Sequence, residues 1–159
     1  MQPEHQYMSG DLSEDLDDLL AILEDGYKAF DQASRRLADT NMEMAAMTMR
    51  DLSAQRRGFS DTIREFTTNH GIELKESGTI RGAFQRGWMA LADAITGDDP
   101  YAVLAVAEEE EDRAVAEYRS ILERDDLGDL RPVIQSQAGQ VFEAHDRVRE
   151  LRDAARANR

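Results

Sequence analysis

Apolar residues recur every three or four positions along most of this chain, and this spacing restricts its possible folds more than any other feature. One face of an α-helix returns with that period, whereas a half-buried strand alternates every two residues. The clearest stripe consists of Leu12, Leu16, Leu19, Leu23, Tyr27 and Phe30. The sequence lacks alternating apolar runs bounded by turn residues, so we expect no strands.

Five helices are expected from these stripes and from the residues that start and stop helices. They begin near Leu12, at Thr40, near Gly78, at Pro100 and near Asp129. Thr40 and Glu43 have the spacing of a capping box, and Gly71 can take the left-handed conformation that ends the second helix. We expect one all-α bundle over residues 11–155, preceded by a flexible leader, residues 1–10. The helix over 78–96, which carries Trp88, is expected to lie across or alongside the four others.

The composition restricts the partners and the location of the protein. The 159 residues carry a formal net charge of −14, and none of them is cysteine. Nucleic acids and anionic membranes require basic surfaces, so we expect neither as a partner. No segment approaches about 18 apolar residues, the length that spans a membrane, and the first residues lack the features of a signal peptide. These features favour a cytoplasmic protein, since a chain without cysteine suits a reducing compartment.

Charged and polar residues interrupt several of the apolar stripes. Glu111 lies in the row of Leu104, Ala107, Ala114 and Tyr118, and Arg56 lies in the row of Met49, Leu52, Phe59 and Ile63. His145 lies in the inward row expected for the last helix, together with Gln137 and Val141, and Glu24 lies beside the first stripe. A buried charge needs a partner. We therefore expect Arg56 and Glu111 to pair inside the bundle, with His145 close by.

Two short stretches stand out, Arg-Gly-Trp-Met at 86–89 and His-Asp-Arg-Val-Arg at 145–149. Weaker features are the stretches 24–26 and 55–59, Glu111-Asp112 with Tyr118, and the rest of 144–153. On these residues the chain resembles, over roughly residues 12–153, an uncharacterised bacterial family of the ferritin-like superfamily. The resemblance implies a ferritin-like four-helix bundle whose additional helix, over 78–96, occupies the crossover connection. The family implies no established activity.

The chain departs from the ligand pattern of a ferritin-like di-iron centre. Such a centre takes two Glu-x-x-His pairs, but the corresponding positions read Ser53-x-x-Arg56 and Phe142-x-x-His145. A guanidinium stays protonated and cannot bind a metal ion. We therefore expect a structural ion-pair network and no cofactor. The alternative is a bound iron or manganese ion, for which Glu24, Glu111 and His145 are the candidate ligands.

We expect a non-enzymatic bundle with an assembly, stress-related or housekeeping role, since no catalytic residues can be assigned. Self-association, most simply as a dimer, is favoured by the acidic start, the basic end and surplus apolar residues such as Met44 and Met47. Two alternatives stay open. One is a metal-binding ferritin-like protein or a carboxylate-bridged di-metal oxidase. The other is an acidic adaptor for a basic protein partner.

Overall fold

The computed structural model describes residues 10–74 and 99–158, and all regular structure in these residues is helical. Its helices are α1 (Gly10–Asp39), α2 (Glu43–Asn69), α4 (Pro100–Leu122) and α5 (Leu130–Ala157). No strand occurs in these two ranges, which confirms the all-α class. The helix predicted over 78–96, with Trp88, lies outside the described residues, as do residues 1–9. Gly10, which was assigned to the leader, begins α1 instead.

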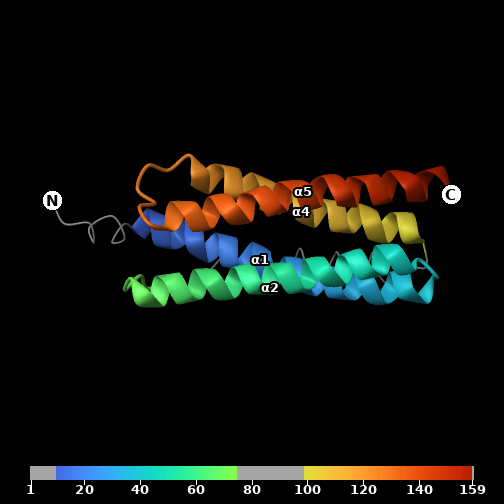
Figure 1. Cartoon of the computed structure of the whole chain (residues 1–159), viewed down its shortest axis with the longest axis horizontal. Helices are drawn as coiled ribbons and strands as arrows, with labels where there is room; N and C mark the ends of the chain where they lie inside the picture. The colour runs from blue at the N-terminus through green and yellow to red at the C-terminus, as the bar shows by residue number, and fades with distance from the viewer. Residues whose placement is uncertain (1–9, 75–98, 159) are drawn as a thin grey trace.

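The four helices lie side by side along the long axis of the molecule (Figure 1). α1 and α2 form one antiparallel hairpin, and α4 and α5 form a second. α2 and α4 point in the same direction, so the end of α2 and the start of α4 lie near opposite ends of the bundle. α1 packs against both α2 and α4, whereas α2 and α5 meet over a smaller surface. None of these four helices is both long enough and apolar enough to cross a membrane.

The capping box expected at Thr40 and Glu43 is wrong. The residue before α2 is Met42, which makes no capping hydrogen bond through its side chain. Thr40 directly follows α1, and its Oγ1 donates to the carbonyl oxygen of Leu37 over 3.0 Å. Asn41 then takes a left-handed conformation, with φ 64°. The Thr-Asn pair therefore closes one helix instead of opening the next, a role for which asparagine is well suited.

The predicted start of α4 and the predicted end of α2 are confirmed. The Asp99 side chain accepts a hydrogen bond from the backbone N–H of Tyr101 over 3.0 Å, and Pro100 occupies the first turn. Gly71 follows α2 with φ 68°, and Gly128 precedes α5 with φ 53°. Glycine adopts such angles readily because it has no Cβ. Local sequence signals were therefore sufficient at the start of α4 and at the end of α2.

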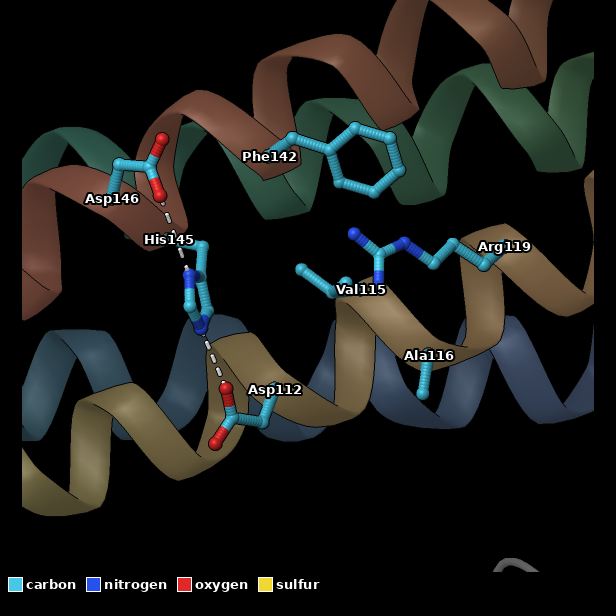
Figure 2. Close-up of a pocket in the computed structure, with 7 residues that line it drawn as sticks. All are labelled: Asp112, Val115, Ala116, Arg119, Phe142, His145 and Asp146. Carbon is cyan, nitrogen blue, oxygen red and sulfur yellow. Dashed lines mark hydrogen bonds and ion pairs between the residues drawn. The ribbon is translucent and has the colours of Figure 1, made fainter.

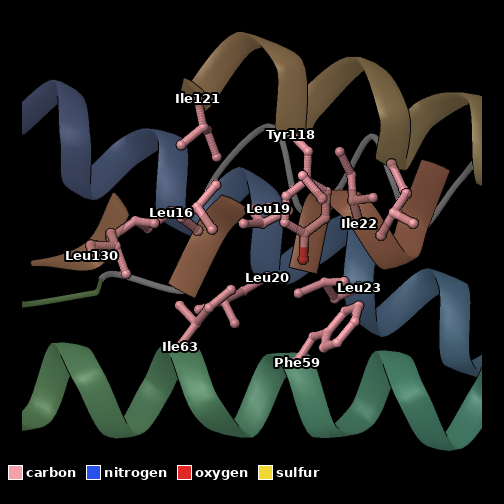
Figure 3. Packing of buried hydrophobic residues seen from close by; sticks show 14 of the residues in the cluster. Leu16, Leu19, Leu20, Ile22, Leu23, Phe59, Ile63, Tyr118, Ile121 and Leu130 are labelled. Atoms are coloured by element: carbon pink, nitrogen blue, oxygen red, sulfur yellow. The ribbon is translucent and has the colours of Figure 1, made fainter. Parts of the chain in front are cut away.

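The apolar core consists of two clusters that follow one another along the bundle. On α1 the boundary falls between Leu23 and Phe30, and on α4 it falls between Ala107 and Ala114. The leucine-rich cluster, part of which is seen in Figure 3, includes Leu12, Leu16, Leu19, Leu20, Leu23, Phe59, Ile63, Tyr118, Ile121, Leu130 and Ile134. The alanine-rich cluster includes Phe30, Ala33, Leu37, Ala45, Ala46, Met49, Leu52, Leu104, Ala107, Ala144, Val148 and Ala155.

Candidate functional site

A charged pair lies between the two apolar clusters, where Arg56 of α2 reaches Glu111 of α4 across the bundle interior. Arg56 Nη1 lies 2.6 Å from Glu111 Oε1, and Arg56 Nη2 donates a hydrogen bond to Glu111 Oε2 over 3.0 Å. The two side chains are 1% and 0% exposed. Arg56 Nε donates to Gln55 Oε1 over 3.1 Å, and the guanidinium lies over the ring of Phe30, 5.2 Å from its centre. All three guanidinium nitrogens therefore have a partner.

The two charges are interior because each replaces an apolar residue in an inward-facing row. Burial raises the pKa of Glu111, and the charge and hydrogen bonds of Arg56 act in the opposite direction. Two contacts between planar groups make a strong and directional ion pair. Each charge stabilises the other in a place where either one alone would be costly.

Two further acids, Asp25 and Glu110, are buried beside the Arg56–Glu111 pair. We call these four residues the polar layer. Asp25 is 7% exposed and Glu110 is 1% exposed. Glu110 Oε1 accepts a hydrogen bond from Arg113 over 3.0 Å, while its Oε2 is buried without a hydrogen-bond partner in the described part of the chain. Desolvation raises the pKa of Glu110 to about 7; Arg113 lowers it and Asp25 raises it further. Glu110 can therefore hold a proton near neutral pH.

The sequence analysis did not single out Asp25 or Glu110, although a weak signal for both exists. Ile22 precedes Asp25 by three positions, and Val106 precedes Glu110 by four. Ile22 and Val106 are themselves buried, at 6% and 7% exposure. The buried faces of α1 and α4 are therefore wider than a single stripe, and each includes an acid at its edge.

Glu24 lies outside this polar layer. Its Oε1 accepts a hydrogen bond from Arg64 Nη2 over 2.7 Å, and the two side chains are 25% and 35% exposed. The contact joins α1 to α2 near the surface, so Glu24 does not meet Glu111 or His145. On α1 it is the next residue, Asp25, that turns inward.

His145 lies on the flank of α5 and not in the core row where we expected it. Its side chain is 19% exposed, with Nε2 2.6 Å from Asp112 Oδ1 and Nδ1 3.7 Å from Asp146 Oδ1 (Figure 2). Ala144 and Val148 fill the inward positions of α5 instead. The predicted orientation of His145 around α5 was wrong by about one residue. His145 therefore pairs with the neighbour of Glu111 and not with Glu111 itself.

A shallow groove of about 460 Å³ surrounds His145 between α4 and α5. Val115, Ala116 and Phe142 supply its apolar lining, and the Arg119 guanidinium lies 5.3 Å from the centre of the Phe142 ring. Figure 2 shows Arg119 and Phe142 together, away from the two aspartates that flank His145. The groove thus has a cationic end and an end with a histidine and two acids.

The three candidate metal ligands, Glu24, Glu111 and His145, do not converge. Among the residues that the structure describes, the acids or histidines close enough to share an ion are Asp15, Asp18 and Glu117, whose carboxylate oxygens lie within 4.8 Å of one another. Asp15 also accepts a hydrogen bond from Arg124 over 2.8 Å. Desolvation, together with Asp18 and Asp15, raises the pKa of Glu117 to about 7. These acids lie near the surface, away from the Arg56–Glu111 pair.

A neutral hydrogen-bond chain joins three helices next to the leucine-rich cluster. Tyr118 is fully buried, and its hydroxyl donates to Gln137 Oε1 over 2.7 Å. Gln137 Nε2 in turn donates to the carbonyl oxygen of Phe59 over 3.3 Å. Burial raises the pKa of Tyr118, so the phenol stays protonated. Gln137 was expected to face inward, and this chain gives the reason why a polar residue is tolerated there.

Comparison with known proteins identifies the family. Residues 11–124 match the family described as Domain of unknown function (DUF2383). The chain belongs to this family. No curated protein and no solved structure matches it. The matched residues include Arg56, Glu110 and Glu111, whereas His145 and Gln137 lie beyond the matched range.

Proposed function

We propose that this protein is a non-enzymatic, ferritin-like helical bundle in which an arginine–glutamate pair replaces the di-iron centre. The observation that carries the proposal is the contact of Arg56 with both oxygens of Glu111, with side-chain exposures of 1% and 0%. A guanidinium has no lone pair to offer a metal ion, and its positive charge repels one. It also occupies both oxygens of the acid that would serve as a ligand.

The direction of the helices supports the ferritin-like part of the proposal. Ferritin-like bundles join two antiparallel hairpins by one long crossover connection. Here the two hairpins are α1–α2 and α4–α5, and α2 runs in the same direction as α4. The resemblance of 86–89 and 145–149 to a bacterial family of that superfamily points the same way.

The role that we propose is assembly with further copies of the same chain, in a stress-related or housekeeping setting in the cytoplasm. Its support is an exposed surface that a solitary bundle does not require. Met44 is 77% exposed and Met47 is 54% exposed, both on α2. Large exposed apolar side chains on one face favour contact with another protein.

Metal content tests the central part of this proposal. The full chain, purified aerobically, is incubated separately with ferrous iron and with manganese, desalted, and its bound metal is measured per chain. We expect no stoichiometric metal and no change in melting temperature, because Arg56 holds the central carboxylate. Two ions per chain would overturn the proposal in favour of a di-metal oxidase.

Two variants make the metal experiment decisive. Ser53→Glu with Arg56→His rebuilds one Glu-x-x-His pair on α2, and we expect this variant to bind more metal than the wild type. Asp18→Asn removes one acid of the surface cluster with Asp15 and Glu117. Metal that is lost with Asp18→Asn can then be counted separately from metal bound in the bundle centre.

A further inference from the structure

The outer face of α2 is exposed along its whole length and carries both apolar and charged residues. Met44 and Met47 are the large apolar side chains that are exposed in residues 10–74 and 99–158. Arg50, Ala54 and Asp61 continue the exposed row at helical spacing. Methionine and arginine are both enriched at protein interfaces, because a flexible apolar chain and a planar cation adapt to a partner surface.

Arg50 and Asp61 on this face are complementary when the helix is turned end to end. Arg50 lies in the first half of α2, and Asp61 lies in its second half on the same exposed face. Arg57 lies over the ring of Tyr27, 4.8 Å from its centre. Within the described residues no ion pair joins Arg50 or Asp61 to another side chain of the same chain.

We propose that the outer face of α2 binds the same face of a second copy, with the two α2 helices antiparallel across a two-fold axis. In such a pair, residues equally far on either side of the axis face each other. Arg50 and Asp61 are equally far from the point midway between Gln55 and Arg56. Arg50 of each copy therefore meets Asp61 of the other copy, and the ion pair forms twice.

This register also covers the exposed apolar residues. Met47 comes to lie beside Thr62 and Glu65 of the second copy, whose methyl and methylene groups pack against its side chain. Asp51 falls opposite position 60 of the second copy, where Gly58 and Thr62 are the exposed residues on that side of the helix, so it meets no like charge. A second copy suits this face better than an unrelated partner, because one chain supplies both members of the Arg50–Asp61 pair. The inference rests on the assembly role proposed above and names the surface that performs it.

Reversal of the paired charges tests the interface. Sedimentation of the full chain over a range of concentrations gives the dimer dissociation constant. We expect Arg50→Asp or Asp61→Arg to raise that constant about tenfold or more, since each places like charges opposite each other twice. The double variant, Arg50→Asp with Asp61→Arg, restores opposite charges and should return the constant to within about threefold of wild type. Arg147→Asp, an exposed reversal on α5, is the matched control and should have no effect.

Cross-linking places the axis independently, since the chain has no cysteine of its own. Ala54→Cys lies close to the proposed axis and should form a disulfide-linked dimer under mild oxidation, whereas Ser136→Cys on α5 should not. A dimer that ignores every α2 variant would overturn this interface and leave the assembly role standing. A monomer at high concentration and moderate salt would overturn both, while the metal measurement would still decide the nature of the bundle centre.

Discussion

The leucine-rich and alanine-rich clusters fill the same bundle in two different ways. In the leucine-rich cluster, Leu12, Leu16 and Leu19 of α1 are fully buried among other large side chains. In the alanine-rich cluster, buried alanines from all four described helices, among them Ala33 and Ala107, lie among larger side chains such as Phe30. Protein interiors have a nearly constant packing density, so small side chains require closer backbones. The first cluster depends on side-chain volume, and the second depends on close approach of the helices.

The polar layer lies at the boundary between the leucine-rich cluster and the alanine-rich cluster. Arg56 falls between Leu52 of the alanine-rich cluster and Phe59 of the leucine-rich cluster, and Glu111 falls between Ala107 and Ala114. A buried ion pair adds little net stability when it is complete but is costly to break. The difference between the clusters therefore predicts three kinds of sensitivity: to lost charge in the layer, to lost volume on one side, and to added volume on the other.

The largest effect is expected for Arg56→Ala in the polar layer. The substitution leaves Glu111 buried without its cation, and we expect a loss of about 3–5 kcal/mol in the free energy of unfolding, measured by urea denaturation. Arg56→Met combined with Glu111→Leu should cost far less, because no charge remains unpaired. Arg64→Ala, which breaks the half-exposed pair with Glu24, is the control and should cost less than about 1 kcal/mol. A nearly neutral Arg56→Ala would show that the layer does not depend on the pair.

Removal of volume from the leucine-rich cluster should have the next largest effect. Leu16 is fully buried, and Leu16→Ala removes side-chain volume where neighbouring large residues cannot easily close the gap. We expect a loss of about 2–5 kcal/mol, measured by thermal or urea denaturation. A loss below about 1 kcal/mol would mean that this half of the core relaxes freely, contrary to the volume argument.

Addition of volume to the alanine-rich cluster should be harmful for the opposite reason. Ala107 is 1% exposed and faces this cluster, so Ala107→Leu forces the helices apart or the side chain into a strained rotamer. We expect a loss of about 1–3 kcal/mol. Ala116→Leu, at an exposed position of the same helix, should stay within about 0.5 kcal/mol of wild type. Equal effects of the two leucines would contradict the close approach that we infer.

The smallest effect that we expect is a pH dependence that originates in the polar layer. Desolvation raises the pKa of Glu110 from 4.5 to about 7, with Arg113 and Arg56 lowering it and Asp25 and Glu111 raising it. The folded chain therefore holds a proton that the unfolded chain has released, and this contribution to stability falls as the pH rises from about 4.5 to about 7.

Glu110→Gln isolates this contribution, because glutamine does not titrate. Relative to wild type, the variant should become more stable by about 1–2 kcal/mol between pH 4.5 and pH 8. The measurement is urea denaturation of both proteins across that range. Glu117, whose pKa is also raised to about 7, stays in both proteins and cancels in the comparison. A constant difference between the two proteins at every pH would show that Glu110 is ionised throughout.

The sequence alone was sufficient wherever a feature depends on one helix at a time. The 3.6-residue period placed Leu12, Arg56 and Glu111 on buried faces, and Pro100 and Gly71 marked helix ends through their backbone preferences. Arg56 and Glu111 were expected to pair because each is the charged member of an apolar row, and the structure has them in contact. The 3.6-residue period therefore predicted the helices, and it identified Arg56 and Glu111 as two buried charges that each require a partner of opposite sign.

Only the tertiary structure decided which neighbour covers each side of a helix. Successive residues are about 100° apart around a helix, so an error of one position moves a side chain from the core to the flank. That rotation separates His145 from Glu111 and gives it Asp112, and it directs Asp25 inward where Glu24 was expected. Glu110 is buried for the same reason, at the edge of a face wider than its stripe. An apolar stripe shows which face of one helix points inward. The width of the buried face depends on the helices that pack against it.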